Sequence, residues 1–322
     1  MRVPSMPDRI PAAGLRWLTL AVVAVATACG SEPPSDPPAT GAALIPTGPL
    51  GADVWIADLR WEASGPPAVA EPTNVTLRPG YDNQPQFVPD GSGFWYTAID
   101  EHDGQADIWR YDFADEMVTR VTQTNPESEY SATPLPDGTG LSVVRVEADS
   151  TQRLWRVDPD GSNTAVLMAD VAPVGYHAWA DEHTLVMFVL GSPATLQRGD
   201  TRTGRASVLA ENIGRSIQRI PDSNDVSFVQ RHEDGAASVM RLPANGSSPE
   251  TLIESVEGGD FHAWAPDGTL LMAHGSIVYG WTPGSGAGWQ PIGDFSRLGI
   301  TISRLAVSPD GSQIALVGEI TP

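Results

Sequence analysis

The chain has 322 residues, of which 41% are hydrophobic, and it contains 32 glycines and 29 prolines. This length can bury a large core, and the abundance of turn-forming residues favours a protein rich in strands and loops. The formal net charge is −21, and every one of the 19 basic residues is an arginine. An acidic surface of this kind repels phosphate backbones and anionic headgroups, which argues against nucleic-acid binding and against membrane docking through basic patches.

Residues 1–28 are typical of a signal peptide. Arginines precede the apolar run 17–28, "WLTLAVVAVATA", which is too short to span a bilayer but long enough for a signal-peptide core. The following stretch "VATAC" resembles the lipobox of bacterial lipoproteins, and the resemblance implies that Cys29 becomes a lipidated first residue. An ordinary secretory signal with a chance cysteine is the alternative. Because Cys29 is the only cysteine, it can form no internal disulfide and no cysteine metal cluster.

Residues 29–50 are predicted to form a lipidated, proline-rich tether. The segment 30–49 holds six prolines and few large apolar groups, so it cannot bury enough surface to offset the entropy of ordering. No aspartate follows Cys29, because Gly30 and Ser31 occupy the next positions. This favours a bacterial envelope protein held by lipid at the outer membrane and facing the periplasm, with no other membrane contact.

A short phrase with a turn signal, such as "HAWAPDG" or "QFVPDG", occurs six times beyond the tether. Successive copies are 47, 45, 40, 45 and 43 residues apart when measured at their acidic residues, which are Asp90, Asp137, Glu182, Asp222, Asp267 and Asp310. One four-stranded propeller blade typically repeats every ~40–45 residues. Proline before Asp-Gly suits a reversal of the chain, so we expect these acidic residues to fix turns.

Each repeat contains further strand signals at constant offsets. Apolar second strands are predicted after the turns, at 93–99, 140–146, 184–190, 225–231 and 313–319. Third strands are predicted at 107–112, 153–158, 195–200, 238–243 and 276–281. Short fourth strands complete the units, as at 118–122 and 250–254. The sequence therefore predicts an all-β protein of four-stranded antiparallel sheets.

The last repeat lacks its third and fourth strands, and segments near the start of the repeats can supply them. Residues 53–59 match the third-strand phrase and residues 73–79 match a fourth strand. Joining them to the last repeat closes a ring and leaves no open sheet edge. We therefore predict a six-bladed β-propeller over residues 51–322, and we expect a monomer. A β-sandwich is the alternative, but it predicts neither the period nor the offset of the ends.

The pattern P-x-F/W-x-P-D-G, followed by an apolar strand and "DIWRYD", resembles the TolB-type propeller repeat of bacterial envelope proteins. The resemblance covers residues 51–320 and implies the fold more strongly than any function. It includes no N-terminal α/β domain of the kind TolB itself carries, so binding of a peptidoglycan-associated lipoprotein does not carry over. Related propellers precede prolyl oligopeptidase-type hydrolases, but the chain contains no G-x-S-x-G nucleophile motif.

His177 and His262 are the main candidates for a site, because each stands before an Ala-Trp-Ala stretch at an equivalent point of its repeat. We expect both near the central channel, where they form a polar cluster for a ligand or a metal together with Asp260, Glu129, Tyr130 and Asp82. The alternative is that the histidines only form hydrogen bonds between blades, and whether a metal binds stays open. Trp179 and Trp264 are in phase with apolar positions, so we expect packing rather than sugar stacking.

These features favour a non-catalytic envelope lipoprotein whose propeller binds a protein or a ligand. An envelope protein or peptide at the channel mouth is the expected partner, and no cofactor is expected. The alternative is an enzyme or lectin that acts in the channel on a small molecule or glycan, either with or without the help of a metal ion.

Overall fold

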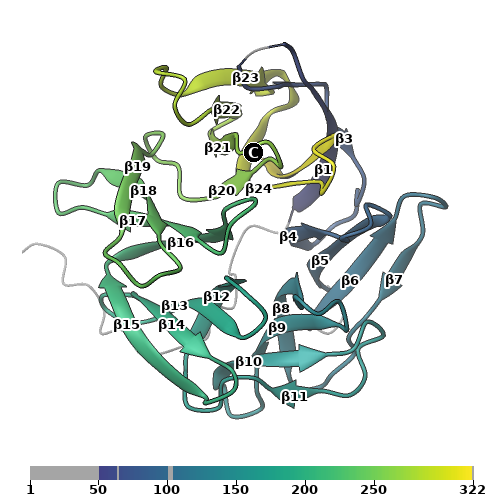
Figure 1. Cartoon of the computed structure of the whole chain (residues 1–322). Helices are drawn as coiled ribbons and strands as arrows, with labels where there is room; N and C mark the ends of the chain where they lie inside the picture. Colours follow the sequence, from purple (N-terminus) through teal and green to yellow (C-terminus); the bar gives the residue numbers. More distant parts are fainter. Residues whose placement is uncertain (1–50, 64, 101–103, 321–322) are drawn as a thin grey trace, which may run out of the picture. The chain divides into compact units, whose positions relative to one another are not determined.

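The computed structural model describes residues 51–63, 65–100 and 104–320, which form strands β1 to β25 and one short 3-10 helix, η1 (Ser296–Leu298). The predicted signal peptide, Cys29 and the tether lie outside the described residues. The strands form six antiparallel blades around a central axis, with the first strand of each blade innermost and the fourth outermost (Figure 1). The predicted all-β six-bladed propeller is confirmed.

Five of the blades are continuous in sequence. Blade 1 comprises β4 (Tyr81–Phe87), β5 (Gly93–Ile99), β6 (Ala106–Asp112) and β7 (Val118–Arg120). Blade 2 comprises β8 (Ser128–Pro134), β9 (Leu141–Val146), β10 (Gln152–Val157) and β11 (Ala165–Val166). Blade 3 comprises β12 (Val174–Trp179), β13 (Thr184–Val189), β14 (Thr195–Asp200) and β15 (Arg205–Glu211). Blade 4 comprises β16 (Ile213–Arg219), β17 (Val226–Arg231), β18 (Ala237–Leu242) and β19 (Glu250–Glu254). Blade 5 comprises β20 (His262–Trp264), β21 (Leu270–His274), β22 (Ile277–Trp281) and β23 (Gln290–Asp294).

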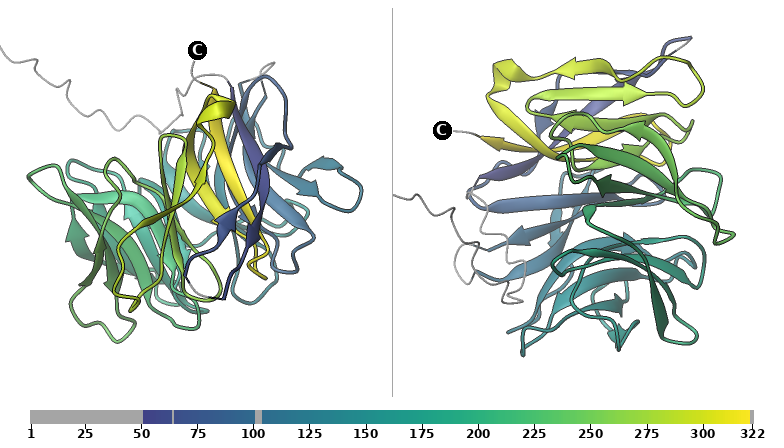
Figure 2. Two further views of the ribbon diagram at one scale, coloured as in Figure 1. Left: turned by 90° about the horizontal axis from the view of Figure 1, so that it is seen from above. Right: turned by 90° about the vertical axis from the view of Figure 1, so that its left-hand side faces the viewer.

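Blade 6 joins the two ends of the folded chain. It contains β24 (Ile300–Val307), β25 (Gln313–Ile320), β1 (Ala52–Arg60), β2 (Ala68–Val69) and β3 (Thr73–Asn74). Strand β1 pairs antiparallel with β25 from Ala52↔Glu319 to Asp58↔Gln313. Figure 2 shows this purple strand beside the yellow C-terminal strands. The predicted closure of the last blade by N-terminal strands is therefore confirmed.

The fourth position of blade 6 is shorter than the predicted segment 73–79. Strand β3 ends at Asn74, whose side-chain oxygen accepts a hydrogen bond from the backbone N–H of Leu77 at 2.9 Å. Leu77 itself lies at a positive φ of 25°. This local turn competes with strand pairing, because an Asn side chain can bond its own backbone a few residues on.

Burial explains why the second strands are the most apolar part of each repeat. Strand β13, "TLVMFV", is buried from Leu185 to Val189, because both of its faces pack inside the ring. The fourth strand of the same blade, β15, is exposed over most of its length. A strand buried on both faces reads as a continuous apolar run, whereas an outer strand tolerates polar residues on both sides.

The turns behave as the sequence predicts in four of the six repeats. Asp90, Asp137, Asp267 and Asp310 each accept a hydrogen bond at 2.9–3.0 Å from the backbone N–H two residues further on. The hydrogen bonds from Ser308 and Ser312 lower the pKa of Asp310 to about 2. In the third repeat the accepting carboxylate belongs to Asp181 rather than to Glu182.

The fourth repeat departs further. Asp222 lies at a φ of 55°, and no hydrogen bond to its side chain is found within the described ranges.

Among the helices of the described residues, none is long and apolar enough to cross a membrane.

Candidate binding site in the central channel

Two adjacent positions of the first strands divide the inner part of the propeller. Residues five places before the acidic turn residue are buried in all six blades, and we call them the packing ring: Pro85, Ala132, His177, Ile217, His262 and Leu305. Residues six places before it all line the central cavity, and we call them the channel ring: Gln84, Ser131, Tyr176, Ser216, Phe261 and Arg304. Successive side chains of a strand point to opposite sides, so the two rings differ in burial, although the packing ring also borders the cavity.

His177 lies between blades 2 and 3. Its Nε2 is 2.6 Å from the Oγ of Ser142, which belongs to β9 of the preceding blade. The same hydroxyl accepts a hydrogen bond from Nε1 of Trp179 at 2.9 Å and donates to the carbonyl of Thr133 at 3.2 Å. Histidine, tryptophan and serine thus tie one blade to the next.

His262 repeats this arrangement between blades 4 and 5. Its Nε2 is 2.8 Å from the Oγ of Ser227 in β17, and Nε1 of Trp264 donates to the same oxygen at 2.8 Å. The hydroxyl of Ser227 donates to the carbonyl of Gln218. A serine hydroxyl has one proton, so its donation to a carbonyl makes the histidine Nε2–H the donor in the imidazole–serine bond.

Burial determines the charge of both histidines. The exposed fractions are 7% for His177 and 1% for His262, and burial lowers the pKa of each imidazole to about 3. Both are therefore neutral near pH 7. The Nδ1 atom of each ring is buried and finds no hydrogen-bond partner among the described residues.

The other predicted site residues lie at separate places. Tyr130 borders a small chamber next to the main cavity, whereas Glu129, Asp82 and Asp260 line neither space. Each of these three carboxylates has its own arginine. Glu129 pairs with Arg145 at 2.7 Å, Asp82 pairs with Arg78, and Asp260 pairs with Arg231 at 3.0 Å. Burial raises the pKa of Glu129 and raises that of Asp82 to about 6.

The structure therefore brings only His177 and His262 of the predicted cluster to one cavity. Over the described ranges, no three His, Cys, Asp or Glu side chains gather closely enough to hold a metal ion.

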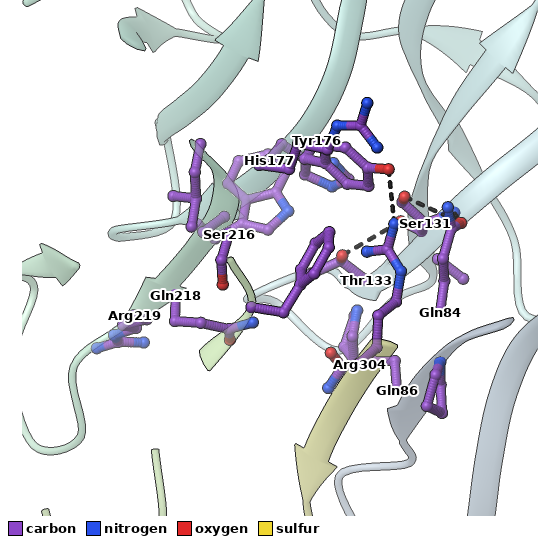
Figure 3. A pocket seen from close by; sticks show the side chains of 18 of the residues that line it. Gln84, Gln86, Ser131, Thr133, Tyr176, His177, Ser216, Gln218, Arg219 and Arg304 are labelled. Carbon is purple, nitrogen blue, oxygen red and sulfur yellow. Dashed lines mark hydrogen bonds between the residues drawn. The ribbon is translucent and has the colours of Figure 1, made fainter. Parts of the chain in front are cut away.

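The central cavity has a volume of about 440 Å³ and is lined from all six blades. Arg304 of blade 6 reaches across the cavity toward the opposite blade 3, where its Nη2 donates a hydrogen bond of 2.7 Å to the hydroxyl of Tyr176 (Figure 3). The Arg304 Cζ lies 3.8 Å from the ring centroid of Phe261 and 4.9 Å from that of Tyr176. The smaller chamber, of about 90 Å³, shares Arg304 and Tyr176 with the main cavity.

Hydrogen bonds to neighbouring blades hold two other members of the channel ring. Gln84 Oε1 accepts from the backbone N–H of Ser131 at 2.7 Å and from its hydroxyl at 3.1 Å. Ser216 Oγ accepts from the backbone N–H of His262 at 3.1 Å. The rim of the cavity is therefore preorganised by contacts between blades.

The charge of the cavity is opposite to that of the chain. Asp and Glu outnumber Arg by 40 to 19 overall, yet the residues lining the cavity include Arg215, Arg219 and Arg304 and no carboxylate. The sequence patterns described above did not point to these arginines. An alignment of the six repeats would have shown Arg304 in the same column as Tyr176 and Phe261, one residue from the column of the histidines.

Comparisons with known proteins agree with the fold. No protein-family model matches the sequence, and no curated protein matches it either. A putative TolB from Agrobacterium tumefaciens is similar, with a TM-score of 0.65, 16% identity, and coverage of 85% of this chain and 100% of that chain. A nidogen/laminin complex matches with a TM-score of 0.55, 14% identity, and coverage of 72% of this chain and 90% of that chain. An oligogalacturonate lyase in complex with manganese matches with a TM-score of 0.51, 18% identity, and coverage of 82% and 79%. At these identities the likeness shows a shared TolB-like propeller fold.

Proposed function

We propose that this protein is a non-catalytic binding module, whose propeller takes a protein segment or a ligand at the mouth of its channel. The observation that carries the proposal is the cavity of about 440 Å³ lined by side chains from all six blades. Concave sites of about 300–1,000 Å³ with a few convergent polar groups are typical of ligand sites. The channel ring supplies such groups on a rigid, closed scaffold.

The chemistry of the lining favours binding over metal-assisted catalysis. Its two histidines are neutral, and their Nε2 atoms are engaged by serine hydroxyls. The lining contributes arginine side chains and no carboxylate, and arginine is a recognition group rather than a metal ligand. The manganese complex of the similar lyase keeps the enzymatic alternative as the second hypothesis for the test below.

An envelope protein or peptide is the partner we propose. The similar nidogen structure is a complex with laminin, which supports a protein partner for a propeller of this kind. The resemblance of the segment before Cys29 to a lipobox supports a lipid anchor that holds the propeller in the bacterial envelope. Mass spectrometry of the mature protein tests the anchor. A diacylglyceryl group on Cys29, absent from a Cys29→Ser variant, is expected.

The binding proposal is tested by photo-crosslinking in intact cells. A photoreactive amino acid replaces Gln218, which lines the cavity, and in a matched control it replaces Ser207 on the exposed strand β15. We expect a discrete cross-linked protein or peptide from position 218 that is absent from position 207. If position 218 gives no specific adduct while the purified protein converts or binds a metal-dependent glycan substrate, the enzymatic alternative replaces the proposal.

A further inference from the structure

We propose that the central cavity binds the carboxylate of an organic anion, with Arg304 as its main partner and Arg215 beside it. This inference rests on the proposed binding function and specifies the ligand chemistry. The same site fits the free C-terminus of a peptide or the carboxylate of an acidic sugar, because both present one planar anionic group. The two sources are separated by the experiment below.

The first argument is the separation of charge. The chain carries a formal net charge of −21, yet neither the main cavity nor the adjoining chamber is lined by a carboxylate. Arg215 and Arg304 border both spaces, and Arg219 borders the main one. Low-dielectric walls focus the field of such groups, so the channel attracts an anion although the protein as a whole repels it.

The second argument is the setting of Arg304. The guanidinium packs against the rings of Phe261 and Tyr176, and its one hydrogen bond found among the described residues goes to the Tyr176 hydroxyl. The rings of Tyr176 and Phe261 are inclined at 74° to each other, so a planar guanidinium can stack on only one of them. A guanidinium has five N–H donors, and the bond to Tyr176 uses one of them. A guanidinium edge matches a carboxylate with two parallel hydrogen bonds. Arg304 is therefore held in place by neutral groups, with donors left for a ligand.

The third argument is that Arg215 has no structural task. Its side chain is exposed, and it has neither an ion pair nor a hydrogen bond to any residue that the structure describes. Arg219 differs, because it donates to the carbonyl of Ser223 at 2.7 Å and to the side chain of Asn224 at 2.9 Å. Arg215 is thus the cation whose removal should weaken binding without loss of an internal contact.

The remaining walls define the rest of the ligand. Leu135, Trp179, Phe261 and Leu305 contribute apolar surface to the cavity. A volume of about 440 Å³ holds a small organic acid or a few residues of a peptide, but not a folded domain. The ligand is therefore an anionic group with an apolar or weakly polar body, and not a bare inorganic ion.

The test uses the mature propeller with its tether and two matched pairs of probes. The first pair is acetyl-trialanine with a free carboxylate against the same peptide as a carboxamide, and the second is glucuronate against glucose. Calorimetric titration at low salt is expected to show binding of one acid and at least tenfold weaker binding of its neutral counterpart. The acid that binds identifies the source as peptide or sugar. Its affinity should fall as sodium chloride is added.

Variants assign the binding to the channel. Arg304→Gln is expected to lower the affinity for the acid at least tenfold, and Arg215→Gln is expected to lower it about threefold. Arg297→Gln is the control, because its side chain is 85% exposed and its one ion-pair partner in the described part of the chain is Glu71 at 3.6 Å. Equal affinity for acid and neutral probe, absence of binding by both acids, or an equal effect of all three variants would overturn the inference. If the acids fail while the cross-link from position 218 persists, the binding function stands and only its carboxylate chemistry falls.

Discussion

The packing ring and the channel ring occupy neighbouring positions at the start of all six blades, yet they differ in burial, because only Ser216 of the channel ring is buried. At the packing-ring position all six residues are buried, and two of them are the histidines that tie blades together. At the channel-ring position all six residues line the central cavity, and one of them is Arg304. All six packing-ring residues border the cavity as well, so a single step along the chain changes how deeply a side chain is buried more than whether it reaches the cavity.

The largest difference between the rings should appear when each loses one side chain. His262→Ala leaves the Ser227 hydroxyl without its imidazole partner and creates a buried void, so it should lower the free energy of unfolding by about 3 kcal/mol. Phe261→Ala removes a partly exposed neighbour and should cost about 1 kcal/mol. Urea unfolding of both variants measures the two values, and equal losses would remove the distinction between the rings.

The pH dependence of stability should come from the packing ring. Each histidine has a pKa of about 3 in the folded protein against 6.5 in the unfolded chain, so the unfolded chain binds more protons between these values. Stability is therefore present above pH 6.5 and is lost as pH falls, by about 2 kcal/mol per histidine at pH 5. His262→Gln should remove one such contribution. The difference in unfolding free energy between pH 7 and pH 5 should therefore be about 2 kcal/mol smaller in the variant.

Asp82 acts in the opposite direction. Burial raises its pKa to about 6 in the folded protein, so its destabilising effect grows as pH rises from the unfolded value of 3.8 through 6. The comparison of wild type with His262→Gln cancels this contribution, because both proteins retain Asp82. An unchanged slope in the variant would mean that His262 is charged or exposed in solution.

Loss of Ser227, the hydrogen-bond partner of His262, should lower stability less than loss of His262 itself. Ser227→Ala removes the acceptor of Trp264 and the partner of His262, and it should cost about 1–2 kcal/mol. Ser207→Ala, on the exposed outer strand β15, should change stability by less than about 0.5 kcal/mol. Thermal and urea unfolding of the two variants measure this difference. Equal losses would show that the hydrogen bonds of Ser227 with His262 and Trp264 do not stabilise the contact between blades.

Loss of Arg304 from the channel ring should affect stability less than loss of His262 from the packing ring. Arg304→Gln loses its contacts with the rings of Tyr176 and Phe261 in two other blades but leaves the buried packing ring in place, so the cost should be about 1 kcal/mol or less. The variant should keep the cooperative unfolding of the wild type. A loss as large as that of His262→Ala would show that Arg304 is a structural group rather than a binding group.

Much of the fold could be predicted because the repeat encodes it locally. The second strand 93–99 was expected at the bounds where β5 lies, since a strand buried on both faces is a continuous apolar run. The closure of blade 6 was expected because an open ring would expose two sheet edges. The segment 73–79 was the exception, since the bond between Asn74 and Leu77 ends strand β3 early.

The candidate site was predictable only in part. The sequence placed His177 and His262 at one level of the ring, and the structure shows both at the edge of the central cavity. It did not identify their partners, although Ser142 and Ser227 each precede their histidine by 35 residues. This shared offset was the available signal. Asp82, Glu129 and Asp260 were grouped with the histidines, but each turned toward its own arginine.

The sequence by itself determined the strands, the turns, the number of blades and the way the ends of the ring meet, because these follow from short-range patterns repeated every 44 residues or so. Only the tertiary structure decided what the centre contains. Arg304 meets Tyr176 across 128 residues of chain, and no periodic pattern encodes that contact. Closing the ring brings six unlike side chains to one axis, and the charge they create there is a property of their assembly rather than of any single repeat.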